Sequence, residues 1–183
     1  MSPAETVRLK GVDAAPVRIA PVRTREDLAA AAALFRAYAV SLPIDLAFQS
    51  FEAELAAMPG AYAPPAGELL LARSLGAAPV GCVALRPIGL DGWSEMKRLY
   101  VMPSARGSGL GGRLVDAIIE EAVRIGYREI RLDTLPTMAG ALALYGTRGF
   151  ERTGAYYDTP VVDTVFMRRT LRPLPACGES GVG

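Results

Sequence analysis

The sequence predicts a single α/β domain built on a mixed, mostly antiparallel sheet flanked by helices. The chain of 183 residues is long enough to bury one sizeable core. Three strand-like runs follow one another with only short turns between them, which is typical of an antiparallel meander. The clearest amphipathic helix, residues 110–125, begins directly after a glycine-rich loop and ends at Gly126.

The expected elements follow the order strand, two helices, three strands, helix, strand, helix and two strands. The strands are expected at residues 17–22, 68–75, 79–88, 92–101, 130–134, 150–157 and 164–171. The helices are expected at residues 25–40, where Thr24 is a natural N-cap, and at 49–58, 110–125 and 137–148. We interpret residues 1–15 as a flexible arm, 16–171 as the domain and 172–183 as a tail.

Charge and composition exclude several classes of function. Twenty basic and nineteen acidic residues give a formal charge of +1, so the basic surplus typical of nucleic-acid binding is missing, and we expect no such partner. No apolar run approaches the roughly 18 residues of a membrane span, and no secretory signal is evident. We therefore expect a cytoplasmic protein without a membrane partner.

The chain contains no histidine, which excludes His-dependent triads, His-rich zinc sites and a histidine general base. Its two cysteines, Cys82 and Cys177, do not form a disulfide framework. Any chemistry must use carboxylate, hydroxyl, phenol, lysine or backbone groups, and we expect no metal.

A glycine-rich loop precedes the strongest helix and indicates an anion site. Glycines at four of the six positions 107–112 let successive backbone N–H groups converge. The helix N-terminus adds unpaired donors and a partial positive charge, which suit a phosphate or pyrophosphate. Arg106 and Arg113 can add charge-assisted contacts. A simple turn is the competing interpretation.

A dinucleotide site is a second alternative, because Gly107-x-Gly109-x-x-Gly112 matches that fingerprint and Asp133 lies where its ribose-binding acid belongs. The surroundings disfavour it. Several residues, one of them proline, separate the preceding strand from the first glycine, and too little chain follows Asp133 for further βαβ units. A phosphate-binding loop of the Walker type lacks its Gly-Lys-Ser/Thr end.

Two motifs, in the right order and about forty residues apart, resemble those of the GNAT acetyltransferase superfamily. The first resembles its pyrophosphate-binding motif and reads Val101-x-Pro103-x-x-Arg106-Gly107-x-Gly109-Leu110-Gly111. The second resembles the helix beside the coenzyme and reads Ala141-Leu142-Ala143-Leu144-Tyr145-x-x-x-Gly149-Phe150. The resemblance covers residues 17–171 and implies a GNAT-like fold and transfer of an acetyl group from acetyl-CoA to an amine.

The resemblance also implies a binding site for acetyl-CoA. Backbone amides of the glycine loop would hold the pyrophosphate, and the pantetheine arm would lie where the strand ending at 99–101 splays from the strand at 130–134. The residues expected to bind acetyl-CoA are Leu99, Tyr100, Val101, Arg106, Gly107, Ser108, Gly109, Leu110, Gly111, Gly112 and Thr134. The asparagine that often begins the family's second helix is absent from residues 137–140, so backbone groups would take over its contact.

Two residues are the candidates for acid and base catalysis. By the resemblance, Tyr145 lies near the coenzyme sulfur and would protonate the leaving thiolate; the alternative is a core tyrosine. Glu95 lies on the strand that the family uses for acceptor-side chemistry, on the same face as Lys97 and opposite Arg98. Glu95 would take the amine proton directly or through water, or it forms an ion pair with Lys97 or Arg98. Asp133 is a second candidate for the base.

The acceptor is expected to be a small-molecule amine. Arg86 and Arg98 favour an acceptor with a carboxylate, such as an amino acid or a derivative. We expect it to meet residues of the loop before the meander and of the last hairpin, namely Tyr62, Tyr156, Tyr157 and Asp158. A non-catalytic domain that binds coenzyme A as a sensor remains an alternative, and the last strands offer edges for a homodimer.

Overall fold

The computed structural model describes residues 17–44, 50–89 and 92–171. The expected arm, tail and first residue of the second helix lie outside this range. Seven strands form one sheet in the order β1-β2-β3-β4-β5-β7-β6. The strands are β1 (Val17–Pro21), β2 (Glu68–Ser74), β3 (Pro79–Pro87), β4 (Trp93–Val101), β5 (Glu129–Thr134), β6 (Glu151–Arg152) and β7 (Val165–Thr170).

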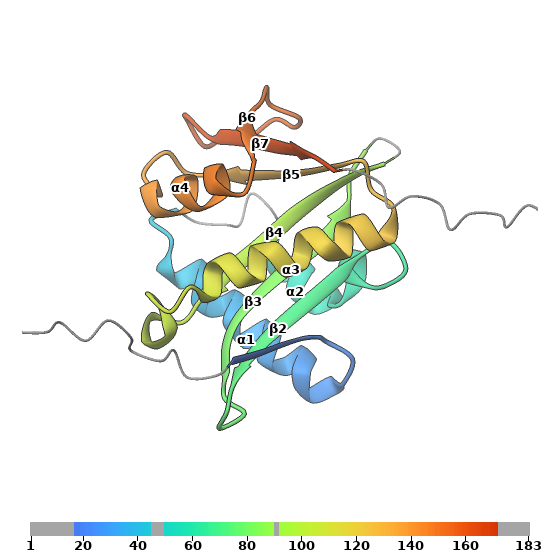
Figure 1. The fold of residues 1–183 in the computed structure, drawn as a ribbon, viewed down its shortest axis with the longest axis vertical. Helices are drawn as coiled ribbons and strands as arrows, with labels where there is room; N and C mark the ends of the chain where they lie inside the picture. The colour runs from blue at the N-terminus through green and yellow to red at the C-terminus, as the bar shows by residue number, and fades with distance from the viewer. Residues whose placement is uncertain (1–16, 45–49, 90–91, 172–183) are drawn as a thin grey trace, which may run out of the picture.

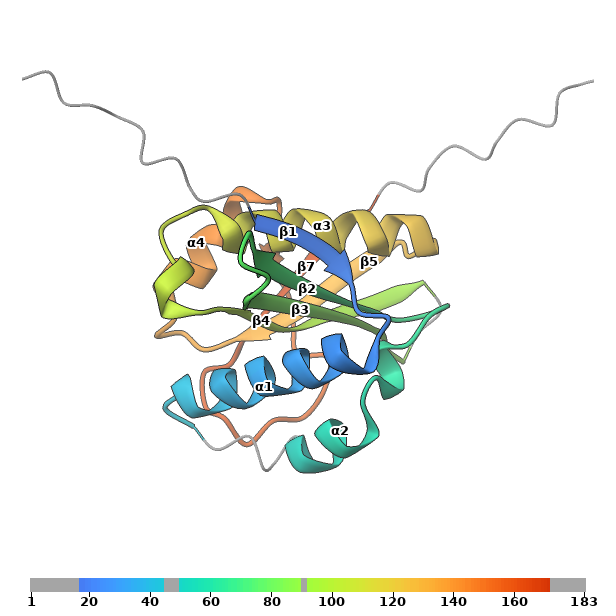
Figure 2. The ribbon, with the colours of Figure 1, turned by 90° about the horizontal axis from the view of Figure 1, so that it is seen from below.

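Helices cover both faces of the sheet. Figure 2 shows α1 (Arg25–Ser41) and α2 (Phe51–Ala57) on one face and α3 (Leu110–Ile125) and α4 (Ala139–Thr147) on the other. Each face has its own buried apolar cluster. All strand pairs are antiparallel except β4 with β5, so the mixed, mostly antiparallel sheet is confirmed. Figure 1 shows α3 lying across this sheet.

Local sequence explains where the long helices begin and end. The Oγ of Thr24 accepts a hydrogen bond from the N–H of Asp27 at 3.0 Å, which is the expected N-cap of α1. In α3, Leu114, Ile118 and Ala122 are fully buried and recur at helical spacing. Gly126 has a φ of +102° and bonds back to the last turn, so it ends the helix as predicted.

The expected strand at 150–157 is wrong over most of its length, because only Glu151 and Arg152 pair with β7. Tyr156 and Tyr157 both pack against the ring of Phe166, with centroid distances of 5.1 and 5.2 Å. Consecutive residues of a strand point to opposite faces, so this packing requires an irregular backbone. The segment is a loop that turns two tyrosines toward the sheet.

The expected position of Arg98, on the face opposite Lys97, is also wrong. Ala84 of β3 pairs with Lys97 and Cys82 pairs with Tyr100, so β4 holds one extra residue in a β-bulge. Arg98 has a φ of +57° there. The bulge interrupts the alternation of the strand and brings Arg98 to the α2 face, where it contacts Glu54.

Within the described residues, no helix has both the length and the apolar character needed to cross a bilayer.

Candidate functional site

Strands β4 and β5 separate halfway along their length. They pair only from Trp93 with Glu129 to Glu95 with Arg131. Beyond Glu95 the strands have no further paired residues, in agreement with the separation at residues 99–101 that the family resemblance implies. A cavity of about 50 Å³, called the gap below, opens between them and is lined by Tyr38, Ile44, Met96, Lys97, Arg98, Leu99, Leu132, Asp133, Thr134, Leu135, Met138 and Tyr145.

A groove of about 790 Å³ runs from the gap to the glycine loop. Gly107 and Gly109 have φ values of +78° and +76°, the left-handed region that favours glycine. Gly109 is the N-cap of α3 and provides no side chain to the first N–H groups of the helix. The N-terminus of α3 therefore keeps its donors and its partial positive charge available to an anion.

Most residues expected to bind acetyl-CoA line this groove, and two of them do not. The lining includes Leu99, Tyr100, Val101, Arg106, Gly107, Gly109, Leu110, Gly111 and Gly112. Ser108 is not part of this lining, and its hydroxyl donates to the carbonyl of Ala105 at 2.7 Å. Thr134 lines the gap instead. The N–H of Arg106 bonds to Pro103 at 3.3 Å, so that amide is already used within the loop.

Gly112 has a different role from the glycines with left-handed backbone. A Cβ at residue 112 would lie 2.0 Å from Nη2 of Arg148. The Nε of Arg148 donates to the carbonyl of Gly112 at 3.3 Å and to Asp116 at 3.0 Å. The missing side chain thus lets the end of α4 contact the first turn of α3. No local pattern in the sequence predicts this contact, since its partners are 36 residues apart.

Tyr145 faces the gap from α4. Its ring is buried and packs edge-on against Phe150, with a centroid distance of 5.8 Å. Burial raises the pKa of its phenol well above the usual value, and the charge of Asp133 adds to the increase. The phenol therefore stays protonated at physiological pH. Tyr145 also belongs to a buried cluster, so the catalytic and core interpretations are compatible.

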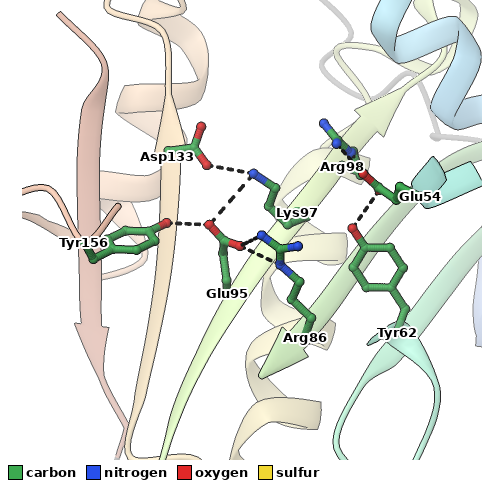
Figure 3. Close-up of polar contacts among 8 residues, drawn as sticks. All are labelled: Glu54, Tyr62, Arg86, Glu95, Lys97, Arg98, Asp133 and Tyr156. Carbon is green, nitrogen blue, oxygen red and sulfur yellow. Dashed lines mark hydrogen bonds and ion pairs between the residues drawn. The ribbon is translucent and has the colours of Figure 1, made fainter. Parts of the chain in front are cut away.

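Three neighbouring ion pairs lie along β4, as Figure 3 shows, and each includes a residue of this strand. Glu95 is fully buried; Arg86 donates to its Oε2 at 2.8 Å from Nε, and the hydroxyl of Tyr156 donates to its Oε1 at 2.7 Å. Lys97 donates to Asp133 at 3.0 Å and lies 3.8 Å from Glu95.

The third pair joins Arg98 to Glu54 of α2, with 3.0 Å between Nε and Oε1. Burial alone would raise the pKa of Glu54, but hydrogen bonds from Arg98 and Tyr62 lower it below its usual value. Glu54 is therefore ionised and paired. The expected ion pair of Glu95 with Lys97 is present as a longer contact, while Arg98 pairs elsewhere.

The sequence interpretation missed Arg86 as the main partner of Glu95. The two residues are register partners on the antiparallel strands β3 and β4. Opposite charges at facing positions of two paired strands are the signal that could have found this pair.

A polar cavity of about 360 Å³ lies beside these ion pairs and is lined by Ser50, Glu54, Arg86, Lys97, Arg98, Tyr157, Asp158 and Pro160. It shares Lys97 and Arg98 with the gap, and the gap shares Tyr38, Leu99 and Met138 with the groove. Of the residues expected to meet the acceptor, Tyr157 and Asp158 line this cavity, whereas Tyr62 and Tyr156 do not and instead donate to the carboxylates of Glu54 and Glu95.

Comparison with known proteins identifies the family. The sequence profile of the Acetyltransferase (GNAT) family matches residues 31–150, about two thirds of the chain. The chain belongs to the GNAT family. This GNAT N-acetyltransferase is 41% identical over 152 residues to an uncharacterized N-acetyltransferase of Schizosaccharomyces pombe, covering 83% of this chain and 93% of that protein.

Solved structures share the fold of this GNAT enzyme. A GNAT acetyltransferase of Staphylococcus aureus superposes with a TM-score of 0.70 at 20% identity and covers 86% of this chain and 100% of its own. The protein yncA of Salmonella typhimurium, solved with its cofactor acetyl-CoA, has a TM-score of 0.64 at 19% identity and covers 90% of this chain and 99% of its own. The GNAT family uses acetyl-CoA as acetyl donor.

The residues of the groove fit acetyl-CoA. The glycine loop and the N-terminus of α3 suit a pyrophosphate, and the unpaired half of β4 leaves backbone groups for an extended pantetheine arm. The dinucleotide interpretation is wrong, because it needs a parallel, doubly wound sheet and only β4 and β5 pair in parallel here. Among the described residues, no group of three or more acidic, Cys or His side chains is arranged to hold a metal ion.

Proposed function

We propose that this GNAT enzyme transfers the acetyl group of acetyl-CoA to a primary amine of a small molecule, an amino acid or a derivative, directly within a ternary complex. The continuity of the three cavities supports this proposal. The groove suits the coenzyme, the polar cavity suits a small acceptor, and the gap between them is lined by Lys97, Leu99, Asp133 and Tyr145. Two substrates bound in these cavities would meet at the gap.

Direct transfer is favoured because Cys82 is poorly placed to act as a covalent nucleophile. Cys82, the cysteine among the described residues, is fully buried, and burial raises the pKa of its thiol. A neutral, inaccessible thiol is a poor carrier of an acetyl group. The amine would therefore attack the donor without an acetylated enzyme.

Acetyl-CoA, when bound, supplies a thioester-activated acetyl group. Tyr145 holds a phenolic proton at the gap and would donate it to the departing thiolate. Backbone N–H groups near Leu99 and Tyr100, in the part of β4 that has no β5 partner, would polarise the carbonyl oxygen. The new bond joins the amine nitrogen to the acetyl carbon, and the carbon–sulfur bond breaks.

The amine must lose a proton, and the geometry favours Asp133 over Glu95 as its acceptor. Asp133 lines the gap, whereas Glu95 lines none of the three cavities and is engaged by Arg86 and Tyr156. We propose that Asp133 accepts the proton, directly or through water, and that Glu95 positions Arg86 and Lys97. A direct role of Glu95 as the base stays a prediction, and comparing the pH profiles of Asp133→Asn and Glu95→Gln tests it.

Steady-state kinetics with both substrates varied tests the proposal. We expect release of free coenzyme A thiol that depends on the amine, a product heavier by one acetyl group in mass spectrometry, and intersecting double-reciprocal lines. Parallel lines would indicate an acetylated enzyme and contradict direct transfer. Coenzyme A binding in calorimetry with no turnover across a broad amine panel would favour the sensor interpretation.

A further inference from the structure

The polar cavity exposes one guanidinium whose donors are only partly used. Arg86 directs Nε and Nη2 to the same carboxylate oxygen of Glu95, and its side chain is 37% exposed. Arg98, by contrast, directs Nε and Nη2 to Glu54, and its side chain is only 3% exposed. A guanidinium has five N–H donors, so Arg86 retains a free edge toward the cavity.

Glu95 and Glu54, two of the carboxylates near Arg86, are already paired with cations, whereas Asp158 also lines the cavity. Glu95 accepts hydrogen bonds from Arg86 and Tyr156, and Glu54 accepts them from Arg98 and Tyr62. Each of these two acids is paired with an arginine of the cavity. The free N–H groups of Arg86 therefore do not face an unpaired carboxylate of Glu95 or Glu54. A negatively charged group of a ligand can therefore bind the free N–H groups of the half-buried Arg86 guanidinium.

Lys97 extends this positive edge toward the gap. Its Nζ binds Asp133 at 3.0 Å and lies 3.8 Å from Glu95, so Arg86, Glu95, Lys97 and Asp133 form one continuous chain of charges (Figure 3). One end of the chain is the guanidinium in the cavity, and the other is the carboxylate at the gap. The guanidinium suits a carboxylate, and the carboxylate of Asp133 suits an amine, so one small molecule that carries both groups could bind both ends.

We propose that the acceptor is an amine that also carries a carboxylate, and that Arg86 determines this specificity. The carboxylate binds the free edge of Arg86, and the amine reaches Asp133 at the gap. Guanidinium groups match carboxylates in geometry and charge. The cavity volume of about 360 Å³ suits a small molecule rather than a protein segment. This inference rests on the proposed acetyl transfer.

A cationic polyamine is the opposing possibility, since the exposed carboxylate of Asp158 also lines the cavity. A second ammonium group would then approach Arg86 and Lys97, which repel it. The experiment therefore includes a diamine.

The test compares acceptors that differ in one charge. The pairs are alanine with alaninamide and 4-aminobutyrate with butylamine, and 1,4-diaminobutane is the cationic probe. For the better of the two carboxylated acceptors, we expect kcat/KM to exceed that of its partner without a carboxylate by roughly tenfold or more. Removal of a charge-assisted hydrogen bond typically causes a loss of this size. Alaninamide has the more acidic amine, so protonation cannot produce a preference for alanine. Equal or better turnover of alaninamide and butylamine, or of the diamine, overturns the proposal.

A variant assigns the preference to Arg86. Arg86→Lys keeps a cation beside Glu95 but loses the fork of donors. We expect KM for the carboxylated acceptor to rise roughly tenfold, and the preference for 4-aminobutyrate over butylamine to fall by about the same factor. Arg73→Lys is the matched control, because Arg73 pairs with Asp27 and lines none of the three cavities. An unchanged carboxylate preference in Arg86→Lys contradicts the role of Arg86.

Binding separates this inference from the proposed function. The same acceptors are titrated by NMR into the protein loaded with coenzyme A. If no amine is acetylated, the transfer proposal fails, and selective binding of alanine or 4-aminobutyrate still supports the carboxylate site. If amines are acetylated without regard to the carboxylate, the transfer stands and the carboxylate site is refuted. Absence of any carboxylate preference in binding refutes it as well.

Discussion

The guanidinium of Arg148 occupies the space that a side chain at Gly112 would need, since a Cβ there would lie 2.0 Å from Nη2. The contact joins two parts of the site. Gly112 belongs to the first turn of α3, which suits the pyrophosphate, and Arg148 follows α4, which carries Tyr145. The hydrogen bonds of Arg148 to Gly112 and Asp116 therefore link the end of α4 to the first two turns of α3.

Gly112→Ala tests the contact, with Gly111→Ala as the control. Alanine is the better helix former by about 1 kcal/mol at either position. A Cβ at residue 111 makes an ordinary contact of 3.6 Å with Leu144, whereas one at residue 112 must displace Arg148. We expect Gly112→Ala to be less stable than Gly111→Ala by about 1 kcal/mol in urea unfolding. This is the typical contribution of a hydrogen bond, and displacing Arg148 breaks its bonds to Gly112 and Asp116. In an Arg148→Ala background the difference should disappear; its persistence would mean that Arg148 is not its cause.

Tyr145→Phe removes the proposed acid and keeps the ring that packs against Phe150. We expect kcat to fall roughly 10²-fold, at the lower end of general-acid effects, with coenzyme A affinity nearly intact in calorimetry. Tyr127→Phe is the control, because it removes a hydroxyl bonded to Ala66 and Tyr127 lines none of the three cavities. Unchanged turnover would remove Tyr145 from the mechanism.

The sequence predicts the features of the site that depend on local pattern. The glycine loop, the strong helix after it and the helix carrying Tyr145 all appear where periodicity and glycine placement indicate. The family resemblance then predicts the separation of β4 from β5, which local pattern alone does not.

Features that depend on distant partners could not be predicted. The alternation of β4 predicts opposite faces for Lys97 and Arg98, but a single extra residue reverses that for Arg98. The segment expected as a strand at 150–157 is mostly a loop, in which both tyrosines pack on Phe166 and Tyr156 donates to Glu95. Both errors arise because tertiary contacts decide the backbone there, and the sequence carries no local signal for them.

The positive φ of Arg98 gives a prediction about the bulge. Glycine adopts this backbone conformation without steric cost, whereas alanine does not. Both Arg98→Gly and Arg98→Ala leave Glu54 without its guanidinium, so that loss cancels in the comparison. We expect Arg98→Gly to be more stable than Arg98→Ala by about 1 kcal/mol, measured by urea unfolding. The reverse order would contradict a left-handed residue at this position.

Asp133→Asn and Glu95→Gln distinguish the two candidate bases. We expect Asp133→Asn to lower kcat/KM and to flatten its rise with pH, because Asp133 lines the gap. Glu95→Gln should keep the shape of the profile and lose roughly 1–3 kcal/mol of stability, since Arg86 loses a charged partner. A flattened profile in Glu95→Gln alone would restore Glu95 as the base.

Buried and half-buried tyrosines with raised pKa values predict how stability changes at high pH. Burial raises the pKa of Tyr38 to about 12 and also raises the pKa values of Tyr62, Tyr145, Tyr156 and Tyr157 above the usual value. A phenol whose pKa is higher in the folded state stabilises that state fully below the unfolded pKa of about 10, and its contribution is lost as pH rises through the folded pKa.

We therefore expect these phenols to leave the free energy of unfolding unchanged between pH 7 and 9 and to make it fall above about pH 10, followed by urea unfolding at each pH. Tyrosinate absorbance should appear together with loss of structure, because the buried phenols ionise only once they are exposed. Tyr38→Phe removes one such group and should make the fall less steep between about pH 10 and 12. Early ionisation of most tyrosines in the intact fold would contradict their burial.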